Sequence, residues 1–136
     1  MLLKALADYD AVLAVAPTMV RALVNRCLTR VTLNTDLAGA LADCNAAVQL
    51  EPANAAALET RGLAYLKLGK PDAASVDFAA VLDADPNRPI ALFGRAVCRS
   101  IDPLSGSLQQ AAADDRDAAM ALDPAVAKSF ARLGLN

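Results

Sequence analysis

The sequence contains no histidine, only three cysteines and six glycines, and 4% aromatic residues. Histidine is the commonest general base and metal ligand, so a Ser/His/Asp or Cys/His nucleophilic site cannot be built. The cysteines form no C-x-x-C pair, which argues against a zinc site or a redox motif. The glycines are too scattered to form a phosphate-binding loop. We therefore expect a protein that is not an enzyme and that binds no metal and no cofactor.

Excess positive charge and long apolar runs are also missing. The formal net charge is −2, so the sequence lacks the surplus of Lys and Arg that binds nucleic-acid backbones. No uncharged apolar run reaches the roughly 18 residues that a membrane span needs, and the N-terminal segment lacks the apolar stretch of a signal peptide. We expect neither nucleic-acid binding nor membrane insertion. A cytoplasmic location and an exported one, with a leader already removed, both stay open.

What the chain does contain is a repeat. Pro17, Pro52, Pro86 and Pro124 follow one another at intervals of 35, 34 and 38 residues. A fixed period between 20 and 50 residues is typical of stacked repeat proteins. Hydrophobic residues make up 56% of the chain and are mostly alanine, leucine and valine, which favours helices. The extra residues before Pro124 are assigned to a loop at 102–107.

Small and large apolar residues recur at fixed distances from these prolines. Six residues after them lie Leu23, Leu58, Leu92 and Phe130, and ten residues after them lie Cys27, Gly62, Ala96 and Gly134. The most regular unit predicts one helix from about Ala55 to Leu68 and a second from about Pro71 to Ala84. Gly69 ends the first of these helices and Pro71 begins the second.

This unit resembles the tetratricopeptide repeat, a helix-turn-helix family of 34 residues per unit. The matching residues are Leu58, Gly62, Tyr65, Gly69, Ala74, Phe78, Val81 and Pro86. The resemblance implies an all-α solenoid of antiparallel helical hairpins that form a right-handed superhelix. The alanine-rich, arginine-using composition is similar to that of bacterial repeat proteins. Departures occur at Arg30 and Arg99, which replace the aromatic residue found at Tyr65.

The whole chain, 1–136, is expected to be one domain of this kind. We expect a half repeat over 1–17 whose helix spans Leu2 to Val15, followed by repeats at 18–52, 53–86 and 87–124. Residues 125–136 would form a C-terminal helix that caps the stack. A chain that begins with half a unit is expected either to be a fragment or to pack its first helix against something else.

A charged pair recurs in every complete unit. Nine residues after a proline stand Arg26, Arg61 and Arg95, and nine residues before the next stand Asp43, Asp77 and Asp115. We predict that each arginine bridges the aspartate of its own hairpin and acts as a structural clamp rather than a ligand site, because the guanidinium fork suits bidentate pairing at partly buried positions.

The cysteines fall at positions where the other units carry Gly, Ala, Phe or Tyr. Cys27, Cys44 and Cys98 are therefore expected to be buried packing residues. A disulfide between Cys27 and Cys44 is left open as an alternative, because both belong to one hairpin.

The first helices of tetratricopeptide units line a concave groove, so their exposed face is the expected binding surface. The candidate partner-binding residues are Val24, Leu28, Val31, Glu59, Leu63, Leu66, Phe93 and Val97. Most of them are apolar and lie three or four residues apart, as on one helical stripe. Such a groove suits the apolar face of an amphipathic helix.

Two functions follow from this surface. The first is a non-catalytic scaffold or adaptor that binds a protein or peptide partner in the groove. The second is a structural or oligomerisation domain of a longer protein, whose groove is covered by its own helices or by a second copy of the chain. The partner and the pathway cannot be predicted from these residues.

Overall fold

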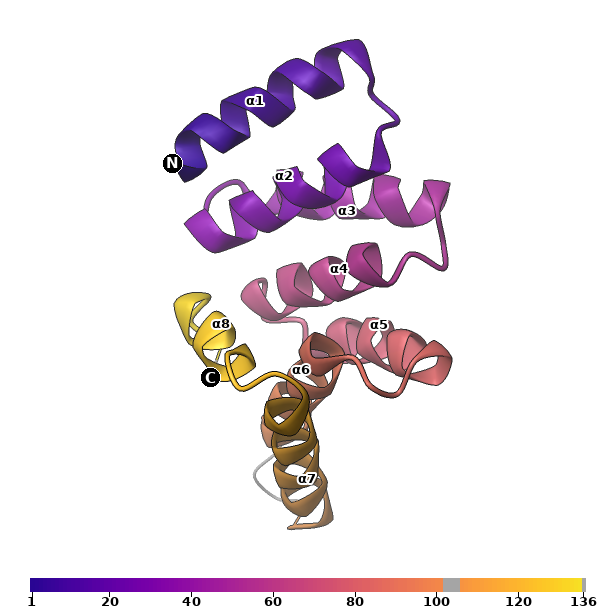
Figure 1. The fold of residues 1–136 in the computed structure, drawn as a ribbon, viewed down its shortest axis with the longest axis vertical. Helices are drawn as coiled ribbons and strands as arrows, with labels where there is room; N and C mark the ends of the chain where they lie inside the picture. Colours follow the sequence, from indigo (N-terminus) through magenta and orange to yellow (C-terminus); the bar gives the residue numbers. More distant parts are fainter. Residues whose placement is uncertain (102–105, 136) are drawn as a thin grey trace.

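A computed structural model describes residues 1–101 and 106–135, which form a stack of helices with no strand in these two ranges (Figure 1). The helices are α1 (Leu2–Val15), α2 (Val20–Leu33), α3 (Leu37–Leu50), α4 (Ala55–Lys67), α5 (Pro71–Ala84), α6 (Pro89–Ser100), α7 (Gly106–Leu122) and α8 (Val126–Arg132). Each helix up to α7 packs against the next one in the chain. The predicted all-α solenoid of helical hairpins is confirmed. None of the helices described is both long enough and apolar enough to cross a membrane.

The hairpins are α2–α3, α4–α5 and α6–α7, and α1 packs against α2 at the N-terminal end. Helices α2, α4 and α6 also contact one another in order, so they form one continuous layer, here called the inner layer. The stack turns along its length: α6 and α7 run in a clearly different direction from α1 to α5 (Figure 1).

The predicted punctuation of the α4–α5 hairpin is present. Asn54 caps α4 by accepting a hydrogen bond from the amide of Ala57 at 3.0 Å. Gly69 follows the helix with a φ of 72°, a left-handed conformation that glycine adopts without steric cost. Pro71 is the first residue of α5. The predicted boundaries of both helices agree with the structure to within one residue.

The first hairpin makes its turn differently. Asn34 and Asp36 replace the single glycine and both have positive φ, 51° and 43°. They lie in the turn where the first unit is one residue longer than the second unit. Asp36 then caps α3 by accepting from the amide of Gly39 at 3.0 Å. The loop expected at 102–107 is described only at its end, where Gly106 and Ser107 belong to α7; residues 102–105 lie outside the described part.

Phe78 occupies the centre of the core between two glycines. Its ring is fully buried, and it faces Gly62 on α4 and Gly94 on α6. A Cβ atom added at Gly62 would lie 2.6 Å from Cζ of Phe78, and one added at Gly94 would lie closer still. The two glycines therefore provide the space that the only phenylalanine of α5 fills, and they let three helices meet around one ring.

Of the two alternatives for the cysteines, the structure contains the disulfide. Cys27 on α2 and Cys44 on α3 are bonded, with their Cα atoms 5.9 Å apart, and both are fully buried. The bond joins the two helices of the first hairpin. Cys98 on α6 is a free thiol that packs against the core but is only partly buried, so the expectation of buried packing residues holds for Cys27 and Cys44 and only in part for Cys98.

The C-terminal helix α8 packs on the last hairpin of the stack. Helix α8 contacts α6 and α7, and the segment after it reaches back to α4, where Nζ of Lys67 donates a hydrogen bond of 2.7 Å to the carbonyl of Leu133. Figure 1 shows α8 beside α4 and α6 rather than below α7. The C-terminal segment thus lies on the inner layer, which changes the expected binding surface.

Candidate interaction surface

Most of the candidate groove residues are buried. Only Leu28 is exposed, at 39% of its surface; the other seven, Val24, Val31, Glu59, Leu63, Leu66, Phe93 and Val97, are each 8% exposed or less. The prediction of a broad exposed apolar stripe is therefore wrong. Most of the buried ones belong to one core cluster together with Phe130 and Leu133 of the C-terminal segment.

Helix α8 covers part of this surface. The ring of Phe130 packs on that of Phe93 with centroids 4.6 Å apart, and the guanidinium of Arg116 on α7 lies 5.8 Å from the centroid of the same Phe93 ring. Phe130 itself is 1% exposed. The chain thus uses its own short helix to cover the α6 part of the inner layer, which is one of the ways of covering that the sequence left open.

An open slot remains beside α8. Two cavities of about 310 and 220 Å³ adjoin there, because both are lined by Leu28 of α2, Leu63 of α4 and Ile90 of α6. Leu28 and Ile90 are the exposed members, at 39% and 38%. We call this feature the inner slot: its apolar floor is Leu28, Leu63 and Ile90, which line both cavities. We call its two ends the parts that belong to one cavity alone, lined by Arg88 in the smaller cavity and by Arg132 of α8 in the larger.

One end of the inner slot contains a charged pair that the sequence analysis missed. Arg88, the residue before Pro89 of α6, donates through Nη2 to Oε1 of Glu59 on α4. The Glu59 side chain is 4% exposed, whereas that of Arg88 is 36% exposed. The other carboxylate oxygen of Glu59 has no hydrogen-bond partner among the described residues. The two residues are 29 positions apart, and this pairing has no counterpart in the other units that could have revealed it.

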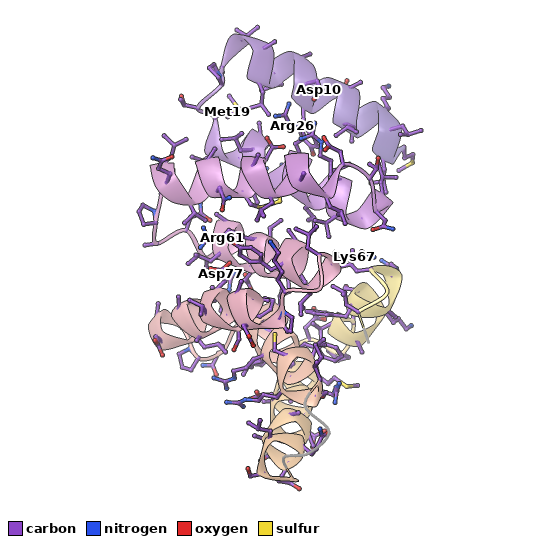
Figure 2. All side chains as sticks on the ribbon, turned by 180° about the vertical axis from the view of Figure 1, so that it is seen from behind. Asp10, Met19, Arg26, Arg61, Lys67 and Asp77 are labelled. Atoms are coloured by element: carbon purple, nitrogen blue, oxygen red, sulfur yellow. A yellow bond between two sulfur atoms is a disulfide. The ribbon has the colours of Figure 1, made fainter. Side chains whose placement is uncertain are left out.

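The three clamps lie away from the slot, between the two helices of each hairpin. Arg61 donates from Nε and Nη2 to the two oxygens of Asp77 at 2.8 and 2.7 Å, and Figure 2 shows the two side chains meeting. Arg26 and Arg95 contact Asp43 and Asp115 in the same bidentate way, at 2.7 to 2.9 Å. Their hydrogen bonds to these aspartates raise the pKa values of the three arginines above the ordinary value, so the three guanidinium groups stay protonated.

Two of these aspartates accept from a second arginine. Arg30 donates to Asp43 at 2.8 Å, and Arg99 donates to Asp115 at 2.6 Å. In the middle hairpin the corresponding residue is Tyr65, whose ring centroid lies 5.9 Å from the Arg61 guanidinium carbon. An arginine in place of the usual aromatic residue, four positions after the clamp arginine, was the signal in the sequence for this second donor.

The clamps also tie neighbouring units together. Arg26 donates to Asp10 of α1 at 2.9 Å, and Arg61 donates to Asn45 of α3 at 3.3 Å. Asp10 and Asn45 both stand seven residues before a proline of the repeat, whereas Ala79 stands there before Pro86. Figure 2 shows Arg26 pointing toward Asp10. The network is thus structural, and it leaves the inner slot as the candidate surface for a partner.

The comparisons with known proteins do not add a family to this description. No family model matches the chain. No curated protein matches it either.

The free thiol gives a prediction about reactivity. Burial is the main cause that raises the pKa of Cys98 to about 11. The reactive thiolate is therefore scarce at neutral pH, and its fraction should increase tenfold for each pH unit up to that value.

Native protein should react slowly with iodoacetamide at neutral pH and faster as the pH rises. Unfolding without reductant should expose one fast thiol per chain, and unfolding with reductant three. Mass spectrometry of the alkylated protein gives these counts, and fast native labelling would contradict the burial of Cys98.

Proposed function

We propose that this protein is a non-catalytic, tetratricopeptide-like scaffold that binds a peptide or an amphipathic helix of a partner on its inner layer. The observation that supports this most is α8, because the inner layer already packs a short amphipathic helix of the same chain through Phe130 and Phe93. A surface that accommodates one helix and leaves an apolar slot beside it suits a second segment placed along the same layer.

The exposure of the slot floor supports the same proposal. Leu28 and Ile90 project from two different helices toward the same cavities and are more than one-third exposed. Exposed aliphatic residues that converge on a concave surface are typical of binding sites rather than of a solvated helix face. The absence of histidine from the sequence argues in turn against the commonest catalytic arrangements.

The test is a selection of peptides with matched surface variants. A random dodecapeptide library displayed on phage is selected against the whole 136-residue chain, and the enriched peptides are measured against Leu28→Glu, Ile90→Glu and Val76→Glu. Val76 is an exposed valine on α5, so it controls for the loss of an exposed aliphatic side chain outside the slot. We expect the two slot variants to weaken binding by about tenfold or more, since a charge is placed in a desolvated contact, and Val76→Glu to have no effect.

Two results of this selection would contradict the proposal. If no peptide is enriched, or if the enriched peptides bind all three variants as they bind the wild type, the inner slot is not a peptide-binding site. Circular dichroism of each variant shows whether the helical fold is retained, which is expected because all three substituted residues are exposed.

The alternative proposal, a structural or oligomerisation domain, is favoured by one observation at the other end of the stack. Helix α1 leaves Leu2, Leu3, Val12 and Val15 exposed, a set of large apolar side chains on one short helix. A stable dimer in sedimentation experiments at low micromolar concentration that dissociates in a Leu3→Glu/Val15→Glu variant would favour it. A monomer that binds the selected peptides would favour the scaffold.

A further inference from the structure

The inner slot carries a charge pattern that differs from that of the whole protein. The chain has a net charge of −2. Among the described residues that line the two cavities, however, Glu59 is the only carboxylate, and it is 96% buried and already bonded to Arg88. The charged groups that a ligand can reach are therefore the guanidinium groups of Arg88 and Arg132.

These two arginines differ in how they are held. Arg88 is fixed by its bond to the buried Glu59, while more than a third of its side chain faces solvent. Arg132 lies in the last turn of α8, is exposed, and forms no ion pair or hydrogen bond with the described residues. At one end of the slot the guanidinium of Arg88 is therefore held in place before a ligand binds. At the other end the guanidinium of Arg132 is not held by any of the described residues.

Further positively charged residues lie near the slot. Lys128 precedes Arg132 by four residues and so shares its face of α8, and Arg21 precedes Asn25 of the slot by four residues on α2. Lys67 is close by and donates only to a neutral carbonyl, so its charge is not compensated there. Positive charge thus surrounds an apolar floor on a protein that is acidic overall.

We propose that the inner slot recognises an acidic, aliphatic segment of a partner protein. An aliphatic side chain enters between Leu28, Leu63 and Ile90, and carboxylates on either side of it pair with Arg88 and Arg132. Arginine forks suit carboxylates, and pairs at the rim of an apolar contact add specificity and speed of association. This inference rests on the proposed function and specifies the chemistry of the partner. A basic segment would be repelled at both ends of the slot.

The same phage-displayed dodecapeptide library tests it, used at low salt with the whole chain. We expect the enriched sequences to contain a Leu, Ile or Val flanked by Asp or Glu. Synthetic copies, acetylated and amidated so that no terminal charge remains, should bind more weakly at high salt. Arg132→Glu should weaken them about tenfold. Lys4→Glu makes the same charge change on an exposed residue of α1, far along the chain from the slot, and should leave the affinity nearly unchanged.

The outcomes separate this inference from the proposal on which it rests. Enriched peptides that are neutral or basic, or that bind Arg132→Glu and Lys4→Glu equally, would overturn the inference while leaving a peptide-binding scaffold. The absence of any enriched peptide would overturn both. A dimer in sedimentation that Leu28→Glu dissociates would show that a second copy of the chain occupies the slot, and would also overturn recognition of a foreign segment.

Discussion

Replacing Arg61 with alanine is expected to lower the free energy of unfolding by about 3 to 5 kcal/mol. The reason is the burial of its partner: the Asp77 side chain is 3% exposed and receives two hydrogen bonds from Arg61. Without the arginine, the buried carboxylate loses the counter-charge that contacts both of its oxygens, and its desolvation is no longer offset. Urea denaturation followed by circular dichroism measures the loss, provided that the slope of the transition is unchanged.

Two controls determine whether the effect belongs to the clamp. Lys70→Ala removes a positive charge at the start of α5 and is expected to change stability by no more than about 0.5 kcal/mol. The double variant Arg61→Met/Asp77→Leu removes the pair without leaving a charge behind, and should recover much of the loss. If Arg61→Ala unfolds at the same urea concentration as the wild type, the pair is not a buried clamp.

The substitution Phe78→Ala is expected to have an effect of similar size, about 3 to 5 kcal/mol. The Phe78 ring is fully buried and lies against Gly62 and Gly94, neither of which has a side chain that could move into the vacated space. A cavity would therefore persist where α4, α5 and α6 meet. Thermal or urea unfolding of the full chain measures the loss.

Substitution of Gly94 tests the same contact from the other helix. Gly94→Ala alone should cost about 1 to 3 kcal/mol, because its Cβ would overlap the Phe78 ring. In a Phe78→Leu background the ring is absent and the same change should cost less. Equal costs in both backgrounds would mean that the overlap is relieved elsewhere and that Phe78 and Gly94 do not determine each other's size.

The repeat itself made much of the fold predictable from the sequence. Because each proline fixes a register, equivalent residues such as Arg26, Arg61 and Arg95 could be compared, and their aspartates identified, before any contact was known. Helix ends were predictable for the same reason, since Asn54, Gly69 and Pro71 act through local backbone chemistry. Local rules and a fixed period determine these features without reference to distant parts of the chain.

The surface was less predictable because it depends on contacts that do not repeat. A helical stripe such as Leu63 and Phe93 looks the same in sequence whether solvent or another helix covers it, and only the position of α8 decides between these. The Glu59–Arg88 pair likewise occurs once, at one junction between units. Arg30 and Arg99 are an intermediate case, since their departure from the aromatic pattern was visible but their shared aspartates were not assigned to them.

The central claim, that the inner slot binds a partner segment, is tested most directly by methyl NMR of the whole chain titrated with a selected acidic peptide. The account predicts that the methyl signals of Leu28, Leu63 and Ile90 shift in a saturable manner while that of Val76 on α5 stays in place. Shifts confined to α1 methyls such as those of Leu3 and Val15, with the slot signals unchanged, would contradict it.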